Sequence, residues 1–328
     1  MRSAFIKALV ELAERDPRIV LIVGDLGFGL VEPFAARFPS RFINAGVAEQ
    51  NMTGIAAGMA LSGAVVFTYS IANFPTLRCL EQIRNDVCYH NANVKIVSVG
   101  AGLAYGALGA SHHSTEDIAV MRTLPNMTVV SPADPLQAEM ATQAIAAASG
   151  PAYLRLGRSG EPVVHEGPVA FRVGKAIQVV NGDDATLIAT GAMVHAAVQA
   201  ARALMRSGGI HARVLSMHTI KPLDESAIVS AMQETAAIVT IEEHSITGGL
   251  GSAVAEVLAE RSTRPVPFKR LALPSEFVST VGSQSHLKDM YSLSVRGVVD
   301  ATLGVLERAG LIGLVRSTDQ ACLLRGSE

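Results

Sequence analysis

The sequence lacks tryptophan and is poor in aromatic and charged residues. Aromatic residues make up 5% of the chain, which argues against a stacking platform for single-stranded nucleic acid. The 27 Lys and Arg residues are balanced by 29 Asp and Glu residues, so the formal net charge is −2. Binding to nucleic-acid phosphates requires a basic surface, and we therefore expect no nucleic-acid partner.

Cysteine and long apolar runs are also scarce. The three cysteines, Cys79, Cys88 and Cys322, show no CxxC spacing and cannot all pair within one chain. This pattern excludes a zinc site of CxxC type and a disulfide framework, and it fits a reducing compartment. Residues 1–16 lack a signal-peptide core, and no uncharged apolar run of about 18 residues occurs. We expect a cytoplasmic protein with no membrane contact.

Apolar residues are abundant in the remainder. The chain has 328 residues, of which 49% are hydrophobic and 17% are charged, compared with about 25% charged in an average domain. At roughly 150 residues per domain, the length predicts two domains. The low charge content allows large cores and a buried subunit interface.

Strand-like and helix-like segments alternate along the chain. Residues 19–23 are a continuous apolar run, typical of a strand buried on both faces. Further strands are predicted at 41–45, 65–69, 94–99, 127–130, 153–156, 186–190, 212–217, 237–242 and 266–272, with helices between them and a last helix at about 294–309. This alternation predicts an α/β fold with two domains, each a mainly parallel sheet covered by helices.

A glycine- and proline-rich segment divides the two series of elements. Residues 157–183 contain Gly157, Gly160, Pro162, Gly167, Pro168 and Gly182. We therefore predict a first domain over 1–160, a linker over 161–183, a second domain over 184–311 and a tail over 312–328.

Generic nucleotide-binding motifs are missing. No G-x-x-x-x-G-K-[ST] loop occurs, and Gly24, Gly27 and Gly29 do not form G-x-G-x-x-G. A different segment carries a chemical signal, because Glu49 stands just after a strand in the first turn of a nearly uncharged helix. One interpretation is a carboxylate stabilised by the helix dipole. The other is a buried carboxylate able to share a proton with a ligand.

The residues around Glu49, F-I-N-A-G-V-A-E-Q-N-M at 42–52, closely resemble thiamine-diphosphate enzymes of the transketolase family. The resemblance covers about residues 2–310. It continues through the segments Glu81-Gln82-Ile83-Arg84-Asn85, Gly109-Ala110-Ser111-His112, Ile220-Lys221-Pro222-Leu223-Asp224 and Glu242-Glu243-His244, in the order of the family. It implies a pyrimidine-binding domain followed by a transketolase C-terminal domain.

The resemblance covers only part of a full transketolase. In the family, a preceding domain holds the cofactor diphosphate through a divalent metal and carries a G-D-G motif, whereas this chain has Gly24-Asp25-Leu26-Gly27. The resemblance therefore implies the β subunit of a split transketolase. Thiamine diphosphate would be shared with an α subunit, which would hold Mg²⁺ or Ca²⁺, within an α2β2 complex. No metal site is predicted in this chain itself.

The resemblance assigns the cofactor contacts to three residues. Glu49 matches the family glutamate that hydrogen-bonds N1′ of the aminopyrimidine and so favours the imino tautomer that activates the cofactor. Phe74 occupies a position where an aromatic ring stacks on the pyrimidine, while a core phenylalanine is the alternative. Tyr69 is a further candidate for a cofactor contact.

Substrate contacts are assigned in the same way. His112 matches the family histidine that reaches the donor ketose near the reacting carbon, and it is a candidate catalytic residue. His113 follows it at a position where the family has Gln or Ala, and we include it as a candidate substrate contact. A metal site built from these histidines with Glu116 and Asp117 is disfavoured, because a helix starting at Ser114 leaves both histidines outside it.

Three positions concern the sugar itself. Leu108 replaces a family Asp that contacts sugar hydroxyls, and Gly100 replaces a family His used for sugar phosphate. Arg158 matches a basic phosphate-contact position, with a surface ion pair as the alternative. Leu108 thus favours a less polar acceptor or a modified sugar.

The resemblance implies transfer of a two-carbon ketol unit from a ketose donor to an aldehyde acceptor. A 2-oxo acid dehydrogenase β chain remains as an alternative, although the segments at 109–112 and 220–224 favour transketolase. A non-catalytic scaffold subunit is a second alternative, which the presence of Glu49 and His112 argues against.

Overall fold

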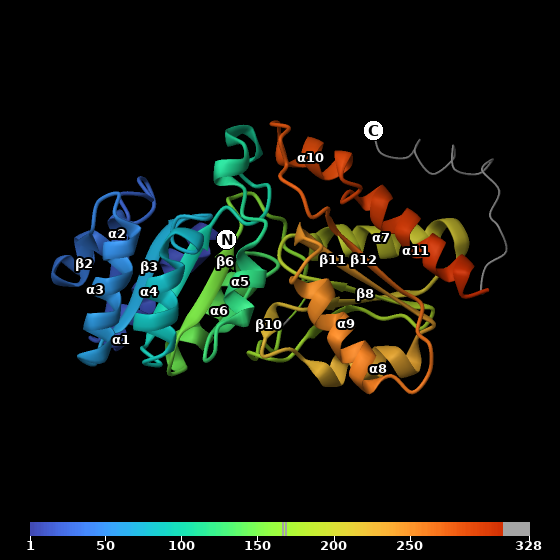
Figure 1. Cartoon of the computed structure of the whole chain (residues 1–328), viewed down its shortest axis with the longest axis horizontal. Coiled ribbons are helices and arrows are strands. Elements are labelled where there is room, and N and C mark those ends of the chain that lie inside the picture. Colours follow the sequence, from blue (N-terminus) through green and yellow to red (C-terminus); the bar gives the residue numbers. More distant parts are fainter. Residues whose placement is uncertain (166, 168, 311–328) are drawn as a thin grey trace.

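The computed structural model describes residues 1–165, 167 and 169–310. It shows two α/β domains side by side, each with a central sheet between layers of helices (Figure 1). The predicted tail at 312–328 lies outside the described residues. No helix of the described part is long and apolar enough to cross a membrane.

The first sheet has seven strands in the order β10-β5-β6-β4-β3-β1-β2. Their bounds are β1 Ile19–Val23, β2 Phe42–Asn44, β3 Val65–Ile71, β4 Val94–Val99, β5 Thr128–Val130, β6 Ala152–Leu156 and β10 Thr219–Lys221. All neighbours are parallel except β10, which pairs antiparallel with β5. β10 comes from the second half of the chain, so the second series of elements completes the first sheet.

Helices cover both faces of this sheet. They are α1 Arg2–Arg15, α2 Glu32–Arg37, α3 Glu49–Leu61, α4 Leu80–Gln82, α5 Asp117–Thr123 and α6 Pro135–Ala147. One core contains Phe5 and Leu9 of α1, while the core on the opposite face contains Met52 of α3. All five residues of β1 are buried, as expected for a strand covered on both faces.

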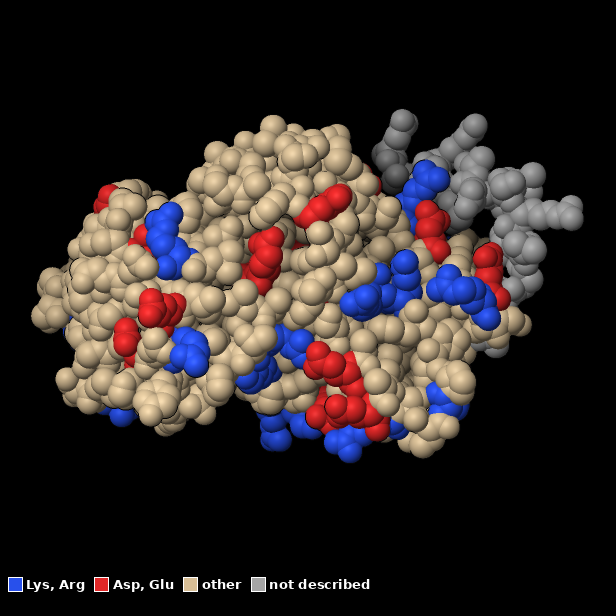
Figure 2. Space-filling view, in the orientation of Figure 1, with Lys and Arg blue, Asp and Glu red and all other residues tan. Residues whose placement is uncertain are grey.

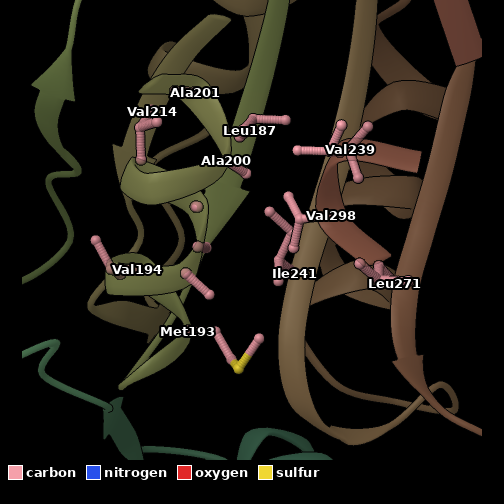
Figure 3. Packing of buried hydrophobic residues seen from close by; sticks show 14 of the residues in the cluster. Leu187, Met193, Val194, Ala200, Ala201, Val214, Val239, Ile241, Leu271 and Val298 are labelled. Atoms are coloured by element: carbon pink, nitrogen blue, oxygen red, sulfur yellow. The ribbon is translucent and has the colours of Figure 1, made fainter. Parts of the chain in front are cut away.

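The second sheet has five strands in the order β12-β11-β8-β9-β7. Their bounds are β7 Ile177–Val180, β8 Ala185–Ala189, β9 Ala212–Ser216, β11 Ala237–Ser245 and β12 Phe268–Leu273. The helices are α7 Met193–Gly208, α8 Glu225–Glu234, α9 Leu250–Arg261, α10 Gln284–Met290 and α11 Val295–Arg308. The core on one face joins side chains of α7 and α11 to the sheet, including Val194, Ala201 and Val298 (Figure 3). The other face packs on α8 and α9.

The structure differs from the predicted elements in several places. β7 lies inside the segment predicted to be irregular, and β10, α2 and α10 were not predicted. The helix expected after Pro75 begins with a 3-10 turn at Leu77–Cys79 and continues through α4 into a π-helix at Ile83–Cys88. The helix expected at Ser114 begins at Asp117 with Glu116 as its N-cap, because the Ser114 backbone instead pairs with Gly102.

A buried ionic network joins the two domains. Arg155 of β6 is 3% exposed, and its Nε donates to Oδ2 of Asp117 at 2.7 Å. Its Nη2 donates to the backbone oxygen of Ser114 at 2.7 Å and to that of Glu243 in β11 at 3.0 Å. Tyr153 donates its hydroxyl hydrogen to the same carboxylate of Asp117. The guanidinium thus connects both sheets through fully buried hydrogen bonds.

Candidate active site

The candidate site lies where β1 and β3 end and α3 begins. Gly24 follows β1, Ser70 is near the carboxyl end of β3, and Glu49 is the first residue of α3. This edge of a parallel sheet is the usual location of ligand sites in open α/β folds. Glu49 is 2% exposed, and its position in the first helical turn favours a negative charge.

Both carboxylate oxygens of Glu49 have partners. Ser70 Oγ donates to Oε1 at 3.1 Å, and Arg78 Nη1 donates to Oε2 at 2.9 Å. A Cβ atom on Gly24 would lie 3.4 Å from Glu49 Cγ and 3.5 Å from Oε1, so glycine leaves space open beside the carboxylate. The buried carboxylate is therefore held in place by a hydroxyl and a cation, next to a glycine surface.

Arg78 connects Glu49 to a group of rings. Its guanidinium carbon lies 4.4 Å from the ring centre of Phe74, and its side chain is 46% exposed. Phe74 is half-buried, and its ring makes an edge contact with the imidazole of His112, with 5.3 Å between centroids. The structure thus brings together Glu49, Phe74 and His112, three residues that the sequence assigns to one site.

His112 ends a 3-10 turn at Ala110–His112, and its Nδ1 lies 3.0 Å from Ser111 Oγ. On its other side is Tyr105, whose ring centre is 6.5 Å away. The guanidinium carbon of Arg158 lies 5.2 Å from the Tyr105 ring centre. Arg158 is exposed, so a row of side chains leads from Phe74 through His112 and Tyr105 to a cation at the surface.

Tyr105 explains why glycine stands at position 100. Gly100 has a φ of +98°, and a Cβ atom there would lie 2.2 and 2.3 Å from two ring carbons of Tyr105. No side chain fits at this position while the tyrosine ring occupies the space. The phenol of Tyr105 therefore fills the place next to the backbone where family members carry a histidine.

Two of the predicted contacts are placed in the interior. Tyr69 is 2% exposed and stacks on Phe5 of the core, with 6.0 Å between ring centroids. His113 is also 2% exposed; burial lowers its pKa, and its Nε2 lies 3.5 Å from the backbone oxygen of Gly106. Neither side chain faces the space around Phe74 and His112 in this chain. We therefore do not retain them as contacts.

Leu108 lies on the surface of the same segment. It ends the 3-10 turn Gly106–Leu108, and 55% of its surface is exposed. Phe28 and Val47, in the loops after β1 and before α3, are 79% and 74% exposed. Large apolar side chains thus surround the opening at this edge of the sheet. Among the described residues no group of three His, Cys, Asp or Glu side chains is arranged to hold a metal ion.

Sequence reasoning missed Arg78, Ser70 and Tyr105. Arg78 and Ser70 contact Glu49 only because β3 and the turn after it lie next to the start of α3. A signal for Arg78 was available, since a buried carboxylate requires a counterion or hydrogen-bond donors. Tyr105 was suggested only indirectly, by the glycine at position 100.

Comparisons with known proteins agree with this geometry. The family model described as "Transketolase, pyrimidine binding domain" matches residues 1–162, and "Transketolase, C-terminal domain" matches residues 174–298. One of the two subunits of the apulose-4-phosphate transketolase of Phocaeicola vulgatus is 41% identical over 309 residues, which are 94% of this chain and 97% of that protein.

Two further relatives have the same extent. The 6-deoxy-6-sulfo-D-fructose transketolase subunit SqwH of Clostridium sp. is 40% identical over 94% of this chain and 95% of its own length. A solved structure described as a split gene transketolase, inactive beta4 tetramer, superposes with a TM-score of 0.85 at 41% identity, covering 93% of this chain and 97% of that chain. The chain therefore belongs to the transketolase family of transferases and corresponds to the β subunit of its split members.

Proposed function

We propose that this chain is the β subunit of a split transketolase. With an α subunit it transfers a two-carbon ketol unit from a ketose donor to an aldehyde acceptor, in the cytoplasm, with thiamine diphosphate as cofactor. The observation that carries the proposal is the grouping of a buried Glu49 with the rings of Phe74 and His112 at one edge of the first sheet.

The residues fit the aminopyrimidine of the cofactor. Glu49 is a buried carboxylate with open space on the side of Gly24, and Phe74 offers a partly exposed ring face nearby. When bound, thiamine diphosphate supplies the thiazolium that accepts the electron pair released by cleavage of the ketose carbon–carbon bond. The donors for its diphosphate and for Mg²⁺ or Ca²⁺ would come from the α subunit.

Each residue then has a defined task. Glu49 holds a proton at ring nitrogen N1′, and Arg78 and Ser70 keep its carboxylate in place. Phe74 fixes the plane of the pyrimidine by stacking. His112, half-buried and hydrogen-bonded to Ser111, donates or accepts a hydrogen bond at the hydroxyl next to the reacting carbon.

The relatives suggest the class of sugar. Their names specify a phosphate-bearing sugar and a sulfonate-bearing sugar. We infer a modified sugar with an anionic end. Arg158, which is exposed and rests on the Tyr105 ring, is the candidate contact for that end.

The apolar rim indicates the docking surface for the α subunit. Phe28, Val47 and Leu108 are exposed around the opening of the site. Figure 2 shows an uncharged surface over the loop that projects between the two domains at the top of the view. Docking of the α subunit on this rim would exclude water from Glu49, and pairing of two such units gives an α2β2 complex.

We expect the purified chain alone to show no turnover, because it lacks the diphosphate and metal donors. Co-purification with its α subunit should restore activity in steady-state assays against a panel of ketoses and 2-oxo acids. Sedimentation of the pair should give the mass of α2β2. Full activity of the isolated chain, or turnover of 2-oxo acids alone, would contradict the proposal.

Leu108 is expected to limit the use of ordinary aldose phosphates. Its side chain accepts no hydrogen bond, and each unpaired sugar hydroxyl costs roughly 1–3 kcal/mol. This corresponds to about a 5- to 150-fold loss in kcat/KM for ribose 5-phosphate relative to a shorter or deoxygenated aldehyde. Leu108→Asp should recover part of the loss in the assembled enzyme, whereas Leu108→Met should not. A wild type that strongly prefers ribose 5-phosphate, with no gain in the Asp variant, would show that Leu108 has no such role.

A further inference from the structure

A cavity of about 210 Å³ lies between the two domains, apart from Glu49, Phe74 and His112. Its walls come from the loops after β5 and β6, the chain start, the start of α7 and α10. Pockets for drug-sized ligands measure about 300–1,000 Å³, so this cavity suits a small ion or group.

The charged groups on the walls leave an excess of positive charge. The amino group of Met1 is paired with Glu161 at 2.8 Å, and Arg155 is paired with Asp117. Glu243 also faces the cavity, but its Oε1 accepts from the backbone N–H of Leu103 at 2.6 Å and from Gln284 Nε2 at 2.9 Å.

Two cations on the walls have no carboxylate partner. Within the described part of the chain, neither Arg158 nor Lys288 forms an ion pair, although both line the cavity. Lys288 is half-buried on α10, and its charge contributes, after burial, to lowering the pKa of His195 on the opposite wall. The positive charge of these two side chains is therefore not balanced by the carboxylates on the walls.

Neutral donors converge on the same space. The 16-residue helix α7 begins at the wall, and its N-cap, Ala192, makes no side-chain hydrogen bond. Its first turn contains no acidic residue. Ser131 also lines the cavity; it is fully buried, and its hydroxyl has no hydrogen-bond partner. A helix start, an unpaired ammonium and an unsatisfied hydroxyl together form an environment that favours an anion.

We propose that this cavity binds a small tetrahedral oxyanion, a phosphate group, held by Lys288, Ser131 and the first backbone N–H groups of α7. Arg158 and His195 close the sides of the site. The ion would join α7 and α10 of the second domain to the loop after β5 of the first. Its source is either free inorganic phosphate or the anionic end of a sugar.

Calorimetric titration of the full chain with inorganic phosphate, in a chloride buffer of constant ionic strength, tests the proposal. We expect one saturable site per chain. Lys288→Gln should weaken binding by about tenfold or more, because it removes a charge-assisted hydrogen bond. Ser131→Ala should weaken it by about fivefold.

Lys269→Gln is the matched control, since Lys269 is an exposed lysine of β12 away from the cavity. It should bind phosphate like the wild type. The absence of saturable binding at millimolar phosphate, or equal losses in Lys269→Gln and Lys288→Gln, would overturn the proposal. This test needs no activity and is therefore independent of the proposed transketolase reaction.

The assembled enzyme distinguishes the two sources. If the group belongs to a sugar, Lys288→Gln raises KM for a sugar phosphate but not for an uncharged aldehyde, and inorganic phosphate competes with the sugar phosphate. If the ion is free phosphate, KM is unchanged, and phosphate raises the thermal midpoint of the wild type more than that of Lys288→Gln. An equal phosphate-dependent shift in both proteins, with no effect on KM, would overturn the proposal.

Discussion

Glu49→Gln is expected to lower the turnover of the assembled enzyme by at least about 100-fold, the usual contribution of a positioned acid–base group. Glutamine keeps the shape of the side chain and can still accept the hydrogen bond from Ser70. It cannot exchange a proton with a ring nitrogen, and it removes the counterion of Arg78. Steady-state rates of the variant, co-purified with its α subunit, measure the loss.

Glu225→Gln is the matched control, because Glu225 is likewise the first residue of a helix, α8, but lies on the surface in an ion pair with Arg261. Its turnover should equal that of the wild type. Circular dichroism and sedimentation should show that both variants fold and assemble. Near-wild-type turnover of assembled Glu49→Gln would rule out the acid–base role.

Asp117→Asn is expected to destabilise the chain by about 3–5 kcal/mol at neutral pH, the usual cost of breaking a buried ion pair. The Arg155 guanidinium would then remain in the interior, 3% exposed, without its counter-charge. Tyr153 would also lose a charged acceptor. Equilibrium urea unfolding gives the difference in the free energy of unfolding.

The control is Asp300→Asn, which breaks a surface pair with Arg296 at 3.6 Å and should cost at most about 1 kcal/mol. Equal effects of the two substitutions would show that the buried pair contributes nothing special.

The pH dependence of stability gives an independent test. Burial acts to raise the pKa of Asp117, but the charge and hydrogen bonds of Arg155 outweigh it and hold the pKa below the ordinary value. A depressed carboxyl pKa stabilises the folded state above the unfolded pKa of about 3.9, and this contribution is lost as the pH falls through the lower folded pKa. The stability difference between wild type and Asp117→Asn should therefore shrink below about pH 4.

Residues within one continuous segment were the most predictable part of the site. Glu49 and His112 each stand in a run of characteristic neighbours, so the sequence alone places them. Arg78 and Tyr105 were missed because their roles depend on loops that bring them against Glu49 and Gly100. Exposure was equally hidden, since Leu108 is half in solvent while neighbouring His113 is buried.

The predictability of the fold follows the same physical limit. Central strands such as β1 and β4 are buried along their whole length, so an apolar run announces them. β10 has three residues and no periodic signal, and it exists only because β5 of the other domain offers a partner. Short elements made by tertiary contact carry too little local information to be predicted.

The pairing of β10 with β5 also affects how the chain can be divided. After β9 the backbone leaves the second sheet, adds β10 to the first, and returns through α8 to the second domain. A fragment that stops between the domains would leave the hydrogen-bonding groups of β5 open, and an unprotected edge strand recruits other chains. We therefore expect residues 1–160 expressed alone to self-associate, so that proteolysis between the domains would yield aggregating pieces rather than two independent proteins.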